Sequence, residues 1–165
     1  MTTNKIYRSI GTAVRFKDTD ATYTITLNNL ATTVGRVSDQ WDRGDAHLPM
    51  RYRWRCCVQF DTAPVVSEYV TLYKFESDGT AGDGVVGTTD AALTQVQANN
   101  GHFLGIVRVQ TTAATTNFIA SGICYIWDRY VSVGLINNTV DSLEATNDAS
   151  WIELTPMIDE IQAAA

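Results

Sequence analysis

The stretch from Met50 to Phe60, MRYRWRCCVQF, places arginines at alternate positions between large apolar residues. In an extended strand, alternate side chains share one face. One face would carry Met50, Tyr52, Trp54, Cys56, Val58 and Phe60, and the other Arg51, Arg53, Arg55, Cys57 and Gln59. Burial is worth about 1.5–3 kcal/mol per large apolar side chain, whereas an exposed arginine ion pair returns about 0.2–1 kcal/mol. The stretch therefore predicts a strand whose apolar face is buried and whose arginines face outward.

The rest of the chain has the punctuation of an all-β protein. Short runs rich in Val, Ile, Thr, Tyr and Phe are separated by Gly, Asn and Asp clusters at fairly even intervals. Strands are expected near residues 12–16, 23–27, 32–37, 51–60, 67–75, 102–109, 118–127, 130–136 and 151–154. Because the loops are short, antiparallel pairing is favoured. We expect an antiparallel two-sheet sandwich, jelly-roll-like, with about nine strands and at most short helices, over 90–98 and from Pro156.

The 165 residues fit one domain, and no repeat or linker divides them. Residues 1–7 and 156–165 are candidate extended arms that could add a strand to the exposed sheet edge of a neighbour. The strand at 67–75 is expected to pair with the strand at 51–60. Because it carries apolar residues on both faces, we expect the core to cover one face and a loop or a neighbouring subunit the other.

Charge and hydropathy exclude several classes of protein. A net charge of -6 and a pI near 4.7 argue against direct nucleic-acid binding. No apolar run approaches the ~18 residues of a membrane span, and the N-terminus lacks the apolar core of a signal peptide. We therefore expect a protein that is made in the cytoplasm and does not associate with a membrane.

No motif for catalysis, cofactor binding or metal binding is found. The sequence contains no G-x-S-x-G, P-loop or H-E-x-x-H pattern. Cys56, Cys57 and Cys124 lack zinc-ligand spacing, which neither His47 nor His102 supplies, so free buried thiols are expected. The loop aspartates Asp18, Asp20, Asp78 and Asp83 could offer oxygen ligands to calcium, but turn formation is the ordinary role of such residues. We expect a protein that is not an enzyme and has no cofactor.

Five residues are candidates for contact with a partner. Arg51, Arg53 and Arg55 would lie about 6–7 Å apart along one face. They either pair with cross-strand acids such as Glu68 or loop aspartates, or form a docking strip for an acidic partner. Trp41 and Arg43, in the polar loop SDQWDRGD, either close one end of the sandwich or contact a partner, because Trp and Arg are common at interface hot spots.

Three stretches together are similar to a known class of protein. They are VSDQWDRGDAHLPMRYRWRCCVQF, YKFESDGTAGDGVVGTTDAAL and DASWIELTPMIDEIQ. They resemble small virion structural proteins of tailed bacteriophages, the jelly-roll or sandwich subunits that decorate or cement the capsid. The resemblance implies a virion protein made in the host cytoplasm that contacts the major capsid protein or other virion proteins. It also implies a homo-oligomer, with a trimer favoured.

A second function stays open at this point. Sandwich proteins also serve as binding modules of tails or fibres, for carbohydrate or a receptor. Loop aromatics such as Trp41, Trp127 or Tyr130 could then stack on a sugar ring.

Overall fold

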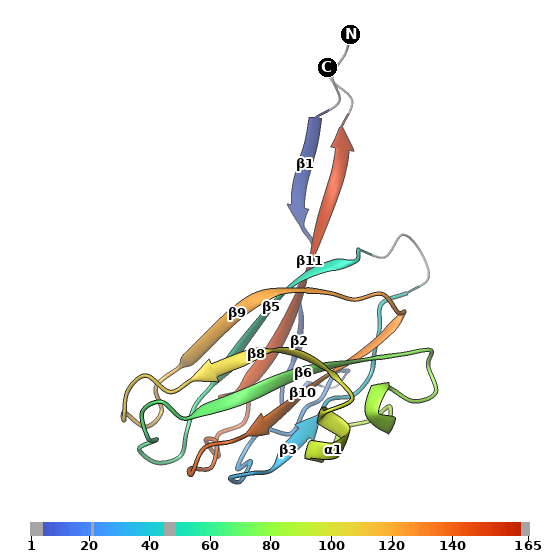
Figure 1. Ribbon diagram of the computed structural model, residues 1–165. Helices are drawn as coiled ribbons and strands as arrows, with labels where there is room; N and C mark the ends of the chain where they lie inside the picture. Colours follow the sequence, from blue (N-terminus) through green and yellow to red (C-terminus); the bar gives the residue numbers. More distant parts are fainter. Residues whose placement is uncertain (1–4, 21, 45–48, 163–165) are drawn as a thin grey trace.

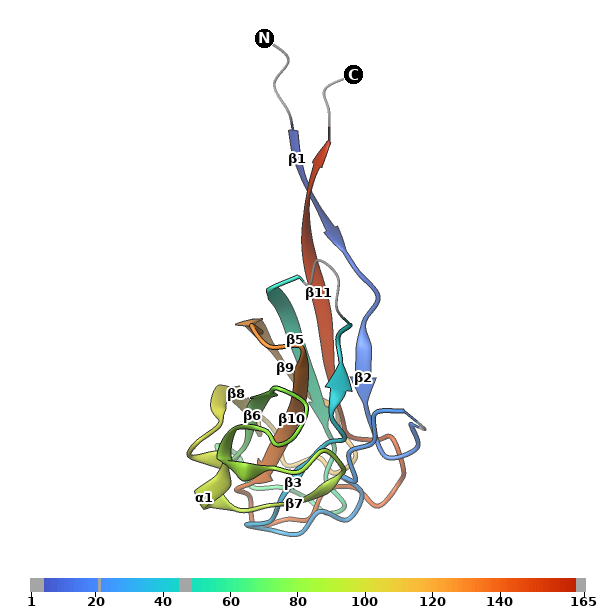
Figure 2. The same cartoon turned by 90° about the vertical axis from the view of Figure 1, so that its right-hand side faces the viewer.

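A computed structural model of the chain describes residues 5–20, 22–44 and 49–162, and two antiparallel β-sheets face each other in it (Figures 1 and 2). The strands are β1 (Lys5–Ile10), β2 (Val14–Phe16), β3 (Gly35–Val37), β4 (Trp41–Asp42), β5 (Arg51–Val58), β6 (Tyr69–Ser77), β7 (Ala91–Leu93), β8 (His102–Arg108), β9 (Phe118–Tyr125), β10 (Tyr130–Asn137) and β11 (Trp151–Gln162). The helical segments are a 3-10 turn, η1 (Asp83–Val85), and one short helix, α1 (Gln95–Ala98). One sheet has the order β1-β11-β5-β9 with β2 also on β11, and the other has the order β7-β3-β10-β6-β8 with β4 also on β10.

The strand order is that of a jelly roll. Eight of the strands form two facing sets of four, β2-β11-β5-β9 and β3-β10-β6-β8. This is the order in which a jelly roll arranges eight consecutive strands, with each sheet built from segments distant in sequence. The predicted all-β, antiparallel two-sheet sandwich of jelly-roll type is therefore confirmed, and the described residues contain eleven strands where about nine were expected.

The alternation predicted for the arginine-rich stretch is confirmed in β5. Tyr52, Trp54, Cys56 and Val58 are buried, whereas Arg53 is exposed between them. Cys57, which was expected on the outward face, is buried as well. Met50 was expected on the buried face, but it precedes the strand and is 50% exposed, because the core ends at Tyr52.

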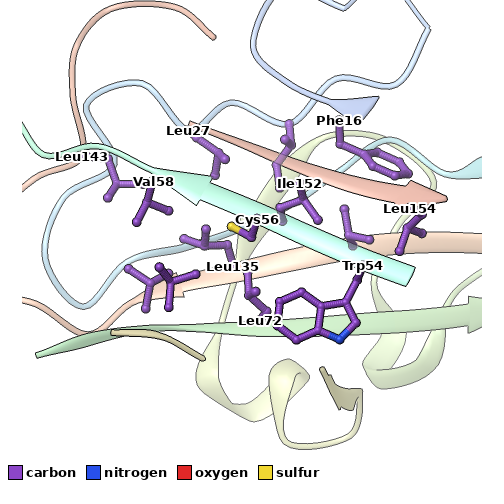
Figure 3. Close-up of a cluster of buried hydrophobic side chains, with 14 of the residues drawn as sticks. Phe16, Leu27, Trp54, Cys56, Val58, Leu72, Leu135, Leu143, Ile152 and Leu154 are labelled. Carbon is purple, nitrogen blue, oxygen red and sulfur yellow. The ribbon is translucent and has the colours of Figure 1, made fainter. Parts of the chain in front are cut away.

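Trp54 lies where the open edges of the two sheets meet. It belongs to the main core, which fills the space between the sheets (Figure 3). A Cβ on Gly105 of β8 would lie 2.6 Å from Cζ2 of Trp54, and a Cβ on Gly122 of β9 would lie 2.6 Å from its Nε1. The indole ring thus fits between two strands of different sheets, and only glycine leaves room for it on both sides.

The outer face of the second sheet is covered by the chain itself. Phe75 of β6 packs with Val86, Leu93 and Ala98, which come from the segment between β6 and β8. The expectation that this strand is covered on both faces is confirmed, and a loop with its short helix provides the cover.

The expected pairing of the strands near 51–60 and 67–75 is wrong. β5 pairs with β11 and β9, whereas β6 pairs with β10 and β8, so the two strands lie in different sheets. The connection between them is far longer than a two-residue hairpin loop and crosses the sandwich.

The strand expected at 23–27 is also wrong, although Ile25 and Leu27 are fully buried. Carboxylates take the backbone N–H groups that a neighbouring strand would otherwise bind. Asp39 accepts from Thr24, Asp90 from Thr26, and Asp18 from Leu27 and Asn28, at 2.6–3.2 Å. The segment therefore buries its apolar residues without a strand ladder.

The two expected helices differ from the structure. Over 90–98 the chain forms β7 and then α1, which begins after a capping box made by Thr94 and Gln97. The helix expected from Pro156 is wrong, because β11 continues to Gln162 and pairs with β1. This part of β11 and β1 extend away from the body as a two-stranded ribbon (Figures 1 and 2). Of the expected arms, residues 1–4 and 163–165 lie outside the described residues.

The glycines beside Trp54 can be tested by adding a methyl group. We expect Gly105→Ala and Gly122→Ala each to lower the free energy of unfolding by about 1–3 kcal/mol, because the core must shift to admit the new Cβ. Gly87→Ala is the control, since nothing lies within 4 Å of a Cβ there, and should change it by no more than about 0.5 kcal/mol. Urea denaturation of the three variants measures the difference. Equal effects at all three positions would contradict the close fit of the Trp54 ring between Gly105 and Gly122.

Candidate functional site

An apolar stripe runs along the outer face of β9, which is an edge strand. Its inward residues, including Phe118 and Cys124, are buried in the core. Its outward residues are mostly large and apolar, and so is Trp127, which continues the same alternation two residues beyond the end of the strand. We call Ile119, Ile123, Tyr125 and Trp127 the β9 stripe; they are 46%, 58%, 51% and 65% exposed. Contiguous exposed apolar surface of this kind marks interaction sites in soluble proteins.

The predicted arginine row lies directly beside the β9 stripe. In the β5–β9 register, Arg51 is opposite Tyr125, Arg53 is opposite Ile123, and Arg55 is opposite Ser121. Paired residues of neighbouring strands share a face of the sheet. The outer face of this sheet therefore combines an apolar stripe at its edge with a row of cations one strand further in.

The acid beside the arginine row is Glu153, not Glu68. Glu153 of β11 is opposite Arg55 and accepts hydrogen bonds from Nε and Nη2 of Arg15 at 3.1 and 2.7 Å. The guanidinium groups of Arg15 and Arg55 lie over the Trp151 ring, at 4.2 and 5.6 Å from its centroid. Glu68, which was expected to pair with the row, directly precedes β6 of the other sheet. Its carboxylate accepts a hydrogen bond from the N–H of Val140.

Arg53 differs from its neighbours. It is exposed, and no ion pair joins it to another described residue. Of the predicted row, Arg53 is thus the cation best placed for contact with a partner.

Trp41 and Arg43 are engaged within the chain at one end of the sandwich. The Trp41 ring packs edge-on between Tyr23 and Tyr52, at centroid distances of 6.4 and 5.9 Å. Arg43 donates to the Tyr52 hydroxyl at 3.0 Å and to the carbonyls of Ile126, Asp128 and Pro49. This geometry favours the lid alternative, and contact of either residue with a partner stays a prediction.

A buried ion pair holds the backbone that carries Trp127. Oε2 of Glu76 accepts from the N–H groups of Trp127 and Asp128 at 2.6 and 2.9 Å, while its Oε1 pairs with Lys74. Both side chains are buried. Burial alone would raise the pKa of Glu76, but the hydrogen bonds from Lys74, Asp128 and Trp127 outweigh it and lower the pKa below its ordinary value. Glu76 therefore stays ionised and fixes the start of the β9–β10 turn.

Two features of this site were missed in the sequence. The sequence predicts a strand here with a buried residue at Cys124, but nothing in FIASGICYIW indicates which of its two apolar faces stays open. The Lys74 and Glu76 pair could have been found in the sequence, because positions 74 and 76 lie on the same face of the strand as the buried Val70 and Leu72. Charged residues on a core-facing row indicate a buried pair.

The described residues offer little for catalysis or metal binding. The three cysteines are free and buried, and burial raises the pKa of Cys124 to about 11, which disfavours a reactive thiolate. In the described part of the chain, no group of three or more His, Cys, Asp or Glu residues is placed to hold a metal ion. The carboxylate of Asp20 accepts from the backbone N–H groups of Thr22 and Tyr23, as expected for a turn former. The carboxylate of Asp18 instead accepts from Leu27, Asn28 and Asp148, and so joins segments that are distant in sequence. None of the described helices has the length and hydrophobicity to cross a membrane.

Comparison with known proteins adds little to this picture. No protein-family model matches the chain. No curated protein matches it either. Among solved structures, a crystal structure of murine APRIL at pH 5.0 is similar, with a TM-score of 0.44 and 9% sequence identity over 93% of this chain and 99% of that chain. A similarity of this size does not bear on the function.

Glu76→Gln tests the support beneath Trp127. We expect a loss of about 3 kcal/mol in unfolding free energy at neutral pH, because Lys74 is left as a buried charge without its carboxylate. Because the folded-state pKa of Glu76 is lowered, its contribution is present above the unfolded pKa and is lost as pH falls through the folded pKa. The difference between wild type and variant should therefore shrink in acid.

Urea denaturation at neutral pH and at about pH 3 measures both effects, the lower pH lying below the ordinary carboxyl pKa. Glu68→Gln, at a half-buried carboxylate that accepts a single hydrogen bond from Val140 and has no buried cation beside it, is the matched control and should change stability by less than about 1 kcal/mol. If Glu76→Gln lowers the stability equally at both pH values, the charge of the Glu76 carboxylate does not contribute to holding Lys74 and the backbone of Trp127.

Proposed function

We propose that this chain is a structural subunit that acts through protein–protein contacts and decorates or cements a bacteriophage capsid. The observation that carries the proposal is the β9 stripe beside the arginine row on a rigid jelly roll. The bacteriophage setting is supported by the resemblance of three stretches of the sequence to capsid decoration and cement subunits. The major capsid protein, or another virion protein, is then the partner, and the virion is the place of action.

The composition of the surface suits a stable protein contact. Burying the exposed half of four large apolar side chains is worth on the order of 3–6 kcal/mol before the costs of association. Aromatic residues and arginine are the residue types that dominate binding hot spots, and both occur here, in Trp127, Tyr125 and Arg53. We therefore expect a partner surface with an apolar centre and an acidic border.

The cations direct the contact. The chain has a net charge of -6, so the row of Arg51, Arg53 and Arg55 is a local basic strip in an acidic protein. Such a strip speeds and orients association with an acidic surface more than it adds affinity. Glu153 offsets part of this charge near Arg55, which leaves the strip most basic at Arg53.

One observation favours a second candidate, a carbohydrate- or receptor-binding module of a tail or fibre. The rings of Tyr125 and Trp127 stack with an interplanar angle of 20° and a centroid distance of 6.3 Å, and both are exposed. Exposed aromatic rings of this kind can stack on the face of a sugar. A glycan array with the purified chain separates the two functions, since capsid binding without any glycan binding leaves only the first.

The capsid proposal is tested with capsids from the encoding bacteriophage that lack the protein. We expect Trp127→Ala to weaken binding by at least about 30-fold, the effect of losing an interface hot spot. Ile123→Lys should abolish binding, because it buries a charge in the apolar centre of the contact. Arg53→Ala should mainly slow association and reduce its dependence on salt.

Val96→Lys is the matched control. Val96 is more exposed than any of the stripe residues but lies on α1, beside the other sheet, so its substitution should leave capsid binding unchanged. Circular dichroism confirms that each variant is folded. Wild-type protein that does not bind the capsids, or binding that survives Ile123→Lys, would refute the proposal.

A further inference from the structure

The ribbon of β1 and the second half of β11 has no other partner among the described residues. β11 pairs with β5 as far as Pro156, opposite Tyr52. Beyond that point it pairs only with β1, from Met157 opposite Ile10 to Gln162 opposite Lys5. Figures 1 and 2 both show this ribbon extending clear of the two sheets. A two-stranded ribbon alone is at best marginally stable in water, so this one needs cover.

The ribbon is a direct extension of the body. The N–H of Gly11 donates to the carbonyl of Pro156 at 3.0 Å, where β1 gives way to β2 along the same edge of β11. A Cβ at Gly11 would lie 2.6 Å from Cγ of Pro156, so only glycine allows the close approach at this junction. The direction of the ribbon is therefore set by the sheet from which it emerges.

The register gives the ribbon one apolar face. Paired positions share a face, and alternate positions along each strand share it too. The pairs on one face are Ile6 with Ile161, Arg8 with Asp159, and Ile10 with Met157. The pairs on the other are Lys5 with Gln162, Tyr7 with Glu160, and Ser9 with Ile158. We call the first set the apolar ribbon face; at its base, the side chain of Ile10 is 65% exposed.

We propose that the ribbon is an oligomerisation element, in which copies of this chain pack their apolar ribbon faces together around a rotation axis parallel to the strands. The pattern of charge on the face identifies a second copy as the occupant. Four of its six positions are apolar, and the two charged positions, 8 and 159, are opposite in sign. Such a face is complementary to itself in one orientation.

Symmetry decides which orientation that is. A rotation axis parallel to the strands brings β1 of one copy against β11 of the next, so position 8 meets position 159 and Arg meets Asp. A twofold axis running across the ribbon through the pair of positions 8 and 159 would instead bring β1 against β1 and β11 against β11, so Arg would meet Arg and Asp would meet Asp. Like charges directly opposite destabilise a pairing, so the parallel arrangement is favoured. All bodies then lie at the same end of the assembly.

The oligomer does not depend on the capsid role. The ribbon and the β9 stripe involve different residues, so purified protein can form the oligomer without any capsid. The axis argument applies equally to two or three copies, because every rotation parallel to the ribbon brings β1 against β11. Sedimentation velocity on the full chain gives the number.

Charge exchange tests the contact between copies. Arg8→Asp and Asp159→Arg each place like charges across the interface, and each should weaken self-association at least about tenfold. Mixing the two variants should restore association, at both contacts of a dimer and at two of the three contacts of a trimer, because position 8 of one variant and position 159 of the other then carry opposite charges. Within each chain the like charges remain, so recovery on mixing reports the contact between copies alone. Ser9→Asp, on the other face, is the control and should leave self-association unchanged.

The doubly exchanged chain, carrying both Arg8→Asp and Asp159→Arg, tests the direction of the axis. It should associate with itself but not with the wild type, whereas an axis across the ribbon predicts the reverse. Native mass spectrometry with ¹⁵N-labelled wild-type protein distinguishes these outcomes. A wild-type chain that is monomeric at micromolar concentration, the absence of recovery on mixing, or co-assembly of the doubly exchanged chain with wild type would overturn the proposal.

Discussion

The Trp54 ring, held between Gly105 and Gly122, is the contact on which the rest of the structure depends. β8 and β9 are the edges of different sheets, and no backbone ladder joins these two described strands. Their separation is set instead by the indole ring of β5 that fits between them. β9 therefore has β5 on one side, Trp54 beneath it, and an open outer face. A strand supported in this way can present large apolar side chains to solvent without losing its position, which a free edge could not do.

The parts of the fold that follow from local alternation could be predicted, and those that depend on distant partners could not. Trp54 and its alternate neighbours had to be buried, because burying these apolar side chains stabilises the fold by more than any exposed ion pair of the arginines could. The pairing of β5 with β6 was wrong because adjacency in sequence says little about which sheet a strand joins after a long connection. The tail after Pro156 is a strand only because β1, from the other end of the chain, supplies its ladder.

The same distinction explains the outcome at the candidate site. The outward direction of Arg51, Arg53 and Arg55 follows from the period of a strand. The exposure of Ile119 and Ile123 does not, because FIASGICYIW is apolar on both faces and gives no sign that one of them lacks cover. That exposure results from topology: the segment between β6 and β8 covers the other sheet, and no described segment covers the outer face of β9.

The two proposed contacts reinforce each other through geometry. Both belong to the first sheet, since β11 joins the ribbon to the strands that carry the arginine row and the β9 stripe. A rotation axis along the ribbon places every copy of the stripe at the same height on the assembly. Binding of one stripe to a repeating surface then raises the local concentration of the others, so modest single contacts add to a firm attachment. The small area of the β9 stripe and the arginine row suits a target with a repeating surface. Several copies that bind together can then reach the affinity for which a single subunit would need a larger interface.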